Sequence, residues 1–315
     1  MKRIFLVLSF VILIGLTGCG NTTPETGNTF IGGTKGLDIM FLQDSPPAEV
    51  FDAGQNPFDV SVQLINVGEY DIPKERVKAK LSGLSPTDFS VPPEEFIKIA
   101  DDDLTKTTKD PQGNKIDGAV SVITFTGLNY NGILSGPTPF PIRVDVCYKY
   151  GTIAESKVCV KENVMNTRDD AVCKVSEEKP VENSGAPVHV TLFNEFAKAK
   201  NKIGFSFKIE HVGDGSIYKR ETDCNAGSLS MLNENLVWVN VDVKPSGVTC
   251  TGLTGGDATS GYTRLFKGSD SDTLSKTVTC TQDLPPATTA YTTVARITIE
   301  YDYKEFVSKD IIVKH

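Results

Sequence analysis

The sequence predicts an all-β protein: two tandem antiparallel β-sandwiches that follow a signal peptide and a flexible tether. Three observations predict this fold. Polar and apolar residues alternate with a period of two over many short segments, which is typical of strands with one buried face. Glycine and proline, present at 27 and 17 residues, separate these segments with turns. The strand pattern of the first half of the chain also recurs in the second half.

The N-terminus predicts export and a lipid anchor. Two basic residues precede the apolar segment 4–16, which is shorter than the ~20 residues that span a bilayer. The next residues, Leu16-Thr17-Gly18-Cys19, resemble the lipobox of prokaryotic lipoproteins, in which the cysteine becomes the lipidated first residue. We therefore expect a signal peptide at 1–18 and lipidation of Cys19. The alternatives are an ordinary signal peptide and a single N-terminal membrane helix.

The mature chain that follows Gly18 is acidic. Removing Lys2 and Arg3 with the signal peptide lowers the 32 basic residues to 30, against 40 acidic residues, for a net charge of −10. Nucleic acids and acidic membrane surfaces are bound mainly through Lys and Arg. We therefore expect no nucleic-acid partner, and membrane contact through the lipid alone. Residues 19–36, with Cys19 at their head, are polar and glycine-rich, which predicts the tether.

The expected strands show strict alternation of polar and apolar residues, and the clearest are 59–64, 76–81, 143–146, 205–209 and 238–243. The segment from Pro93 to Leu104 instead predicts a helix of about three turns. Many short strands with Gly and Pro turns favour antiparallel sandwiches over a parallel sheet.

An internal repeat sets the expected domain boundaries. Three segments of the first half align in order with three of the second: 60–72 with 205–217, 143–150 with 296–303, and 157–161 with 310–314. The alignment predicts a first sandwich at 37–163 and a second at 187–315. The stretch 164–186 between them is charged and contains Asn183-Ser184-Gly185, so we interpret it as the junction.

Six cysteines remain beyond Cys19, and an even number outside the cytoplasm predicts disulfides. If the strand pair 143–150 and 157–161 folds back around Ile153, Cys147 and Cys159 lie opposite each other. The repeat places Cys250 and Cys280 where the first copy has the apolar residues Val91 and Phe125. The expected pairs are thus Cys147–Cys159, Cys250–Cys280 and, by elimination, Cys173–Cys224. A zinc site is the competing interpretation, and the absence of any CxxC pair argues against it.

Short motifs resemble a known family. The strand that ends in Asn66-Val67-Gly68 resembles the corresponding strand of the cell-adhesion-related domain of bacteria and archaea, and His211-Val212-Gly213 is a degenerate version of it. The two-copy layout and the strand Cys147-Tyr148-Lys149-Tyr150 also resemble predicted surface lipoproteins of archaea. The resemblance implies immunoglobulin-like sandwiches and a location at the cell surface. It carries no catalytic residues.

No catalytic, cofactor or metal site is expected. The motifs of α/β-hydrolases, zinc proteases and nucleotide-binding loops are absent. The acidic runs Asp101-Asp102-Asp103 and Asp270-Ser271-Asp272 could bind calcium but lack the EF-hand spacing, so a solvated charge run is favoured. Trp238 could point outward and stack on a sugar or a partner, although an edge residue covered by a loop is the simpler interpretation.

These observations predict a membrane-anchored, non-enzymatic surface lipoprotein with a binding, adhesion or envelope-structural role. Its expected partners are the membrane, through Cys19, and a surface protein or glycan. Two alternatives remain open: a surface hydrolase with a dispersed carboxylate site, and the solute-binding lipoprotein of a transporter, which usually needs two α/β lobes.

Overall fold

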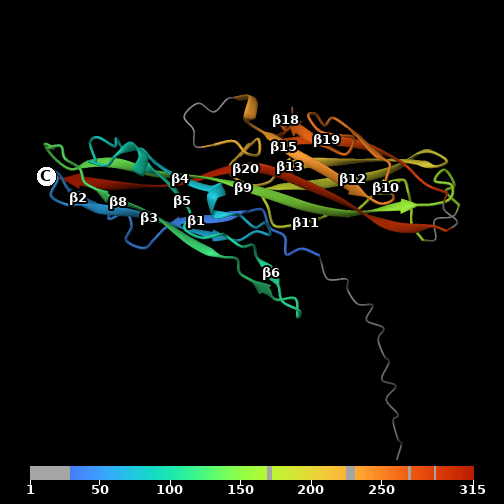
Figure 1. The fold of residues 1–315 in the computed structure, drawn as a ribbon, viewed down its shortest axis with the longest axis horizontal. Helices are drawn as coiled ribbons and strands as arrows, with labels where there is room; N and C mark the ends of the chain where they lie inside the picture. Colours follow the sequence, from blue (N-terminus) through green and yellow to red (C-terminus); the bar gives the residue numbers. More distant parts are fainter. Residues whose placement is uncertain (1–28, 169–171, 225–230, 269–270, 287–288) are drawn as a thin grey trace, which may run out of the picture.

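The computed structural model describes residues 29–168, 172–224, 231–268, 271–286 and 289–315. These residues form an elongated rod made almost entirely of antiparallel strands (Figure 1). The helical content of the described chain is limited to short 3-10 turns: η1 (Lys74–Arg76), η2 (Pro93–Phe96) and η3 (Met231–Asn233). The all-β prediction is confirmed. Within this part of the chain no helix has the length and apolar character of a membrane span, and the apolar segment 4–16 lies outside it.

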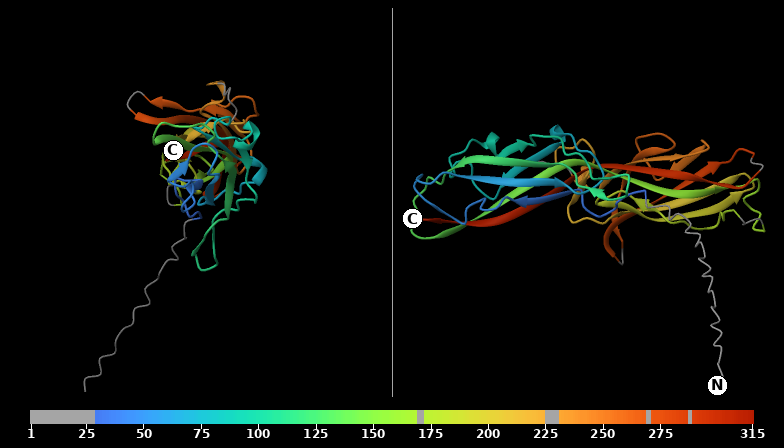
Figure 2. Two further views of the ribbon diagram at one scale, coloured as in Figure 1. Left: turned by 90° about the vertical axis from the view of Figure 1, so that its left-hand side faces the viewer. Right: turned by 90° about the horizontal axis from the view of Figure 1, so that it is seen from below.

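Two long strands form the axis of the rod. β9 (Thr138–Val160) has 23 residues and β20 (Tyr291–Lys314) has 24. They pair antiparallel along their full length, from Tyr291 opposite Val160 to Val313 opposite Thr138. At ~3.3 Å per residue such a pair is about 75 Å long. Both strands therefore run from one end of the rod to the other, as Figures 1 and 2 show.

The remaining strands complete two sandwiches around this pair. β9 and β20 belong to a nine-stranded sheet with the order β17-β15-β20-β9-β4-β5, to which β2, β11 and β14 add short pairings. The three-stranded sheet β1-β3-β8 covers it in one half of the rod, and the six-stranded sheet β10-β12-β13-β19-β16, with β18, covers it in the other. A separate two-stranded hairpin, β6–β7, projects from the side of the rod.

The bounds of these strands follow chain order: β1 (Leu37–Phe41), β2 (Glu49–Phe51), β3 (Phe58–Asn66), β4 (Val77–Ser82), β5 (Ile97–Ile99), β6 (Thr108–Lys109), β7 (Lys115–Ile116), β8 (Val120–Leu128), β10 (Glu177–Glu178), β11 (Glu182–Asn183), β12 (Val188–Ala199), β13 (Lys202–His211), β14 (Ser216–Tyr218), β15 (Leu236–Val243), β16 (Val248–Thr251), β17 (Ser260–Arg264), β18 (Phe266–Gly268) and β19 (Ser271–Asp283).

The two copies of the repeat exchange the second halves of their last strands. The repeat maps Lys149 onto Asp302, and these two residues lie directly opposite each other in the β9–β20 pair. Lys149 and Asp302 therefore mark a local pseudo-twofold centre, which we call the waist. Beyond it, residues 303–313 of the second copy pair with 138–148 of the first. The predicted boundary between 37–163 and 187–315 therefore does not separate two independent sets of strands.

The predicted hairpin around Ile153 does not form. Ile153 lies within β9, opposite Thr298 of β20. A two-residue hairpin turn needs residues with positive φ, and Gly151, the only glycine near this point, does not adopt one. Instead, the ring of Tyr70 fills the space beside Gly151, where an added Cβ would lie 2.4 Å from its Cε2. β9 therefore continues straight and takes its partner from the other copy.

The predicted helix from Pro93 to Leu104 is also wrong. Only η2 is helical, and it is followed by the edge strand β5, in which Ile99 lies opposite Lys78 of β4 and Ile97 opposite Lys80. Two β-branched residues at alternate positions favour a strand. The pairing with β4 therefore outweighs the helical pattern of the flanking residues.

Four tyrosines occupy the core at the waist, where both copies contribute equally. Tyr150 lies opposite Tyr301, and Tyr148 opposite Tyr303. All four are fully buried, as the alternation predicts. Neighbouring rings contact each other with centroids 5.8–6.5 Å apart. The buried apolar residues of both halves form one continuous cluster through this point.

Candidate functional site

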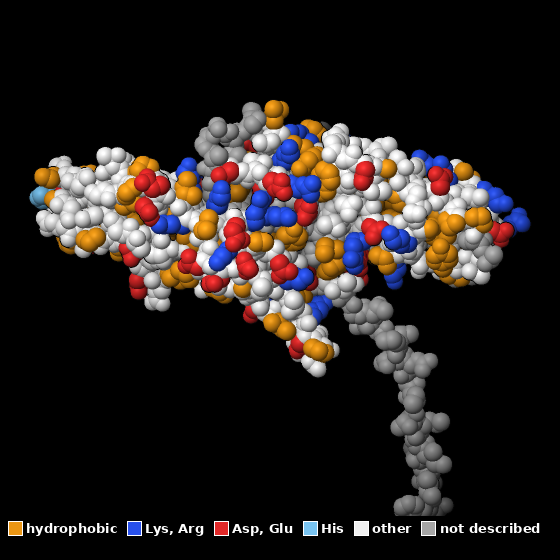
Figure 3. Space-filling view, in the orientation of Figure 1, with side chains coloured by type: hydrophobic (Ala, Val, Ile, Leu, Met, Phe, Trp, Pro, Cys, Tyr) orange, Lys and Arg blue, Asp and Glu red, His pale blue; other side chains and the backbone are white. Residues whose placement is uncertain are grey.

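The solvent-facing side of β9 and β20 at the waist carries a network of charged side chains, which we call the waist cluster. Its members come from four separate parts of the chain: Arg76, Lys149, Arg220, Glu300 and Asp302. Figure 3 shows charged side chains of both signs gathered over the middle of the rod. Lys149, Glu300 and Asp302 share one face because side chains alternate along a strand and these positions are paired across the sheet.

Glu300 is the hub of the waist cluster. One of its carboxylate oxygens accepts a hydrogen bond from Tyr70 Oη at 3.1 Å and pairs with Lys149 Nζ at 3.4 Å. The other pairs with Arg220 Nη1 at 2.8 Å. Burial alone would raise the pKa of Glu300, but Lys149, Arg220 and Tyr70 hold it below its usual value. Glu300 is therefore an anion that connects β20 to β9 and to the loop that follows β14.

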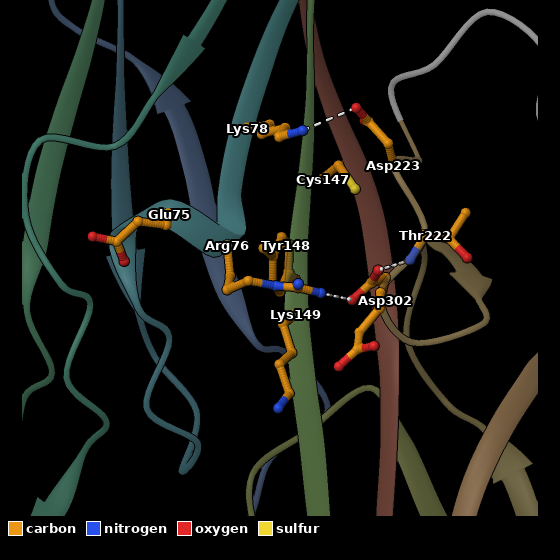
Figure 4. Close-up of a pocket in the computed structure, with 10 residues that line it drawn as sticks. Glu75, Arg76, Lys78, Cys147, Tyr148, Lys149, Thr222, Asp223 and Asp302 are labelled. Carbon is orange, nitrogen blue, oxygen red and sulfur yellow. Dashed lines mark hydrogen bonds and ion pairs between the residues drawn. The ribbon is translucent and has the colours of Figure 1, made fainter.

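Asp302 ties the two copies together two residues further along β20. Its Oδ1 pairs with Arg76 Nη2 at 3.4 Å, and its Oδ2 accepts a hydrogen bond from the backbone N–H of Thr222 at 2.7 Å (Figure 4). Burial is the main cause that raises the pKa of Asp302 to about 6, against the lowering effects of Arg76 and the Thr222 N–H. A carboxyl with a raised pKa beside a pocket is a candidate for proton transfer.

A cavity of about 190 Å³ opens beside Asp302. Its wall includes the disulfide between Cys147 and Cys224 and the ion pair between Lys78 and Asp223, whose Nζ and Oδ2 lie 2.9 Å apart. The lining residues carry both signs of charge: Glu75, Arg76, Lys78, Cys147, Tyr148, Lys149, Glu221, Thr222, Asp223 and Asp302. Figure 4 shows Lys78 reaching toward Asp223 and Arg76 reaching toward Asp302. The arrangement fastens the first copy to the second.

Trp238 lies next to the waist cluster and is half-buried. Its ring meets Tyr262 edge to face, with centroids 4.9 Å apart, and the Arg220 guanidinium lies 4.0 Å from the ring. Cation–π contacts of this kind stabilise by roughly 0.5–1 kcal/mol at exposed sites. The same arginine binds Glu300, so Trp238 supports the waist cluster and is covered by it. Trp238 is thus covered by the loop after β14, as the simpler interpretation expected, but it is not an edge residue, because β15 pairs with β17 on one side and β20 on the other.

The end of the predicted tether is bound close to the waist. The Glu69 carboxylate accepts backbone hydrogen bonds from Ile31 at 3.0 Å, Gly32 at 2.9 Å and Gly185 at 2.7 Å. Thr29 N–H also donates to Glu182 Oε2 at 2.7 Å. Within the predicted tether, residues 29–36 are therefore part of the folded rod. The polar, glycine-rich composition gave no signal of this.

The structure contains three disulfides: Cys147–Cys224, Cys159–Cys173 and Cys250–Cys280. The predicted Cys250–Cys280 pair is correct, and its residues lie opposite each other in β16 and β19. The predicted pairs Cys147–Cys159 and Cys173–Cys224 are wrong.

The straight course of β9 explains both errors. Cys147 and Cys159 lie on the same strand, about 40 Å apart at ~3.3 Å per residue, whereas a disulfide needs Cα atoms within about 7 Å. Cys147 instead meets the loop after β14, and Cys159 meets the junction. Three disulfides indicate an extracytoplasmic protein.

The other residues considered in the sequence fall into structural roles. His189 Nε2 lies 3.1 Å from Gly33 O, and His211 Nε2 lies 2.8 Å from Tyr303 Oη. In the described residues no three metal-binding side chains come together. The Asp101-Asp102-Asp103 run is exposed except for its contacts with Lys74. Cys19 and Asp270 lie outside the described residues.

Sequence reasoning missed the waist cluster, although one signal was present. The repeat already placed Lys149 over Asp302, which are opposite charges at equivalent positions. Arg76, Arg220 and Glu69 carried no such signal, because their partners come from segments far away in the sequence.

No family model matches this chain, and no curated protein matches it. A comparison with solved structures finds the crystal structure of a mutant of CfaE, the CFA/I adhesin of enterotoxigenic E. coli. The alignment covers 91% of this chain and 88% of that chain, with 9% sequence identity and a TM-score of 0.12. A score this low carries no argument about fold or function.

The raised pKa of Asp302 gives a testable pH dependence. The carboxyl has a higher pKa in the fold than its usual 3.8, so its contribution to stability is present below about pH 4 and is lost as the pH rises through about 6. Asp302→Asn imitates the protonated form at every pH. The unfolding free energy of the variant minus that of wild type should therefore be about 2 kcal/mol larger at pH 8 than at pH 4. Urea unfolding at both pH values measures it.

Glu300→Gln is the matched control on the same strand and face. Because the pKa of Glu300 is lowered in the fold, its stabilising contribution is present at neutral pH and lost in acid. The unfolding free energy of Glu300→Gln minus that of wild type should therefore be smaller at pH 8 than at pH 4. This change with pH has the opposite sign to that of Asp302→Asn. If both variants showed the same sign, the assignment of the Asp302 proton would be wrong.

Proposed function

We propose that the protein is a membrane-anchored cell-surface lipoprotein that acts by binding, as a rigid rod that presents its ends, and not by catalysis. The lipobox-like sequence at Cys19 supports the anchor, and the three disulfides agree with a location outside the cytoplasm. The all-β architecture of the described residues gives no support to a solute-binding protein of two α/β lobes.

The observation that carries this proposal is the continuous β9–β20 pair, which is fastened at the waist. Residues 29–36 are bound to the rod at this same point, through the contacts with Glu69 and Glu182. The segment from Cys19 to residue 28 spans at most ~35 Å when fully extended. Half of the rod is about 37 Å long, by the rise per residue of β9. An anchored rod is therefore held near its middle, within ~35 Å of the membrane, with both ends free.

The raised pKa of Asp302 is the observation closest to an enzymatic alternative. Both carboxylate oxygens of Asp302 are, however, already bound: one pairs with Arg76 of the first copy, and the other accepts the Thr222 N–H of its own copy. A general acid must reach a substrate proton. We therefore assign Asp302 to the fastening of the two copies.

Changing Cys19 tests the anchor. Cys19→Ala should release the protein from membranes or leave it uncleaved, because the lipidated thiol is lost. Fractionation of membranes, together with the mass of the N-terminus, measures both results. Ser9→Ala, which lies in the apolar segment and leaves the lipobox intact, is the control and should stay bound. Normal cleavage with unchanged membrane partition of Cys19→Ala would contradict the proposal.

A further inference from the structure

The two ends of the rod differ in charge, although the repeat makes them equivalent. At the end that holds the C-terminus, loops 53–57 and 127–139 contain no Asp, Glu, Lys or Arg. We call these two loops the neutral tip. At the opposite end, the turn 198–202 between β12 and β13 carries three lysines. Figure 3 shows the contrast: one end is nearly free of charged side chains, and the other carries several.

Ionisable side chains border the neutral tip without belonging to it: Asp52, Asp59, Asp88, Lys314 and His315. Several of them hold the loops in place. Asp52 is buried, accepts the Leu134 N–H at 2.7 Å and lies 3.1 Å from His315 Nδ1. Asp59 Oδ1 accepts the Gly127 N–H at 2.8 Å. Part of the bordering charge is thus used inside the structure.

The two loops of the neutral tip are fastened to each other. Ala53 N–H donates to Gly132 O at 2.8 Å, and Gly54 N–H donates to Tyr130 O at 2.7 Å. Asn129 Nδ2 donates to Gly54 O at 2.8 Å. Ala53 has a φ of 55°, a left-handed conformation that costs about 1–2 kcal/mol for a residue other than glycine. Strained backbone that the surrounding structure fixes in place is found most often at functional sites.

A cluster of aromatic rings supports the neutral tip from below. Tyr130, Phe89 and Phe140 contact one another with centroids 5.2–5.5 Å apart. A surface that is ordered before binding loses little entropy when it binds. The tip is therefore a preformed surface.

The exposed groups of this end are apolar side chains and uncharged hydrogen-bonding groups. Phe51, which adjoins the first loop, is 53% exposed, and Ile133 is 77% exposed. The amides of Gln55 and Asn56 are also exposed. The two loops contain fewer residues than the roughly 20–30 that each side of a stable protein–protein interface uses. A small ligand with apolar faces and hydroxyl groups fits this surface better than a protein does.

We propose that the neutral tip binds an uncharged glycan. Sugar hydroxyls pair with the amides and the loop backbone, and the C–H face of a sugar ring packs on Phe51 and Ile133. A sialylated or sulfated glycan would find no cation within the loops. This proposal rests on the proposed function, because it names the class of molecule that one end of the surface rod binds.

The test uses the full chain, purified in detergent, on an array of neutral oligosaccharides of hexose and N-acetylhexosamine units with sialylated and sulfated versions of the same chains. Wild type should retain one or more neutral oligosaccharides. The double variant Phe51→Ala with Ile133→Ala should bind at least tenfold more weakly. Raising NaCl from about 50 to 500 mM should change the affinity less than twofold, because no ion pair is involved.

Met165→Ala is the matched control, since Met165 is 57% exposed near the opposite end of the rod. It should bind like wild type. Three results would overturn the proposal: no retained neutral oligosaccharide, preference for the charged versions, or equal loss in the control. Capture of a protein through the tip instead of a sugar would also overturn it. If membrane partition still depends on Cys19 in any of these cases, the anchored rod stands and only the glycan proposal fails.

Discussion

Cutting the backbone at the exposed turn near Met165 should leave two fragments that stay together in native buffer, even after reduction. The first fragment keeps β9 and the second keeps β20, and these strands pair over their full length. Each half of the rod thus contains strand residues from both fragments. The apolar core is also continuous across the waist. Separation would expose both halves of that core.

A protease site inserted after Met165 makes this measurement direct. The cut and uncut proteins should elute at the same volume in gel filtration with reductant, and the fragments should separate only in denaturant. Reductant is needed because Cys147–Cys224 and Cys159–Cys173 both bridge the cut. Two folded halves that separate in reductant alone would mean that the first copy folds back around Ile153, as the sequence predicted, and the second copy at the equivalent point of β20.

Replacing Tyr150 by alanine should lower the unfolding free energy by about 3–5 kcal/mol and destabilise both ends of the rod together. The ring is fully buried, with its centroid 5.5 Å from that of Tyr70, and its hydroxyl donates to Gly185 O at 3.1 Å. Gly68 packs directly against it, since a Cβ there would lie 1.9 Å from Tyr150 Oη. Tyr150 therefore joins β9, the segment 29–36 and the junction.

Urea unfolding measures the total loss of stability, and amide hydrogen exchange reports the stability of each half of the rod separately. Amides of β3 report on one half and amides of β13 on the other, and both sets should lose protection to the same extent in Tyr150→Ala. Tyr291→Ala is the control: Tyr291 is 40% exposed at the start of β20, so its loss should stay near 0.5 kcal/mol. Protection that falls in one half only would show that the waist does not couple them.

The period-two pattern correctly predicted the all-β class and the buried faces of the clearest strands. Tyr148, Tyr150, Tyr301 and Tyr303 are core residues as expected. The pattern was not sufficient to predict the path of the chain after Tyr150. A hairpin around Ile153 and a straight β9 place the same side chains inside, so alternation cannot distinguish them. The choice depends on whether another strand is available to pair with β9, and that strand lies in the other copy.

The candidate site was less predictable than the fold. The two wrong disulfide pairs follow from the single error at Ile153, whereas Cys250–Cys280 is correct because it depends only on the repeat. Arg76, Arg220 and Glu69 act through partners that are distant in sequence. No local spacing of polar residues reveals such partners, because each of these side chains resembles a solvated charge.

The two copies exchange the second halves of β9 and β20. The single chain therefore has the architecture of a strand-swapped homodimer whose two subunits are joined. A true homodimer obeys its symmetry, so both of its ends must be identical. Fusion removes that requirement, and the chain shows the result: the second copy carries Cys250–Cys280, which the first copy lacks, and one end is neutral where the other is lysine-rich. Under the function proposed above, the rod therefore presents two unlike ends, kept about 75 Å apart by the length of β9.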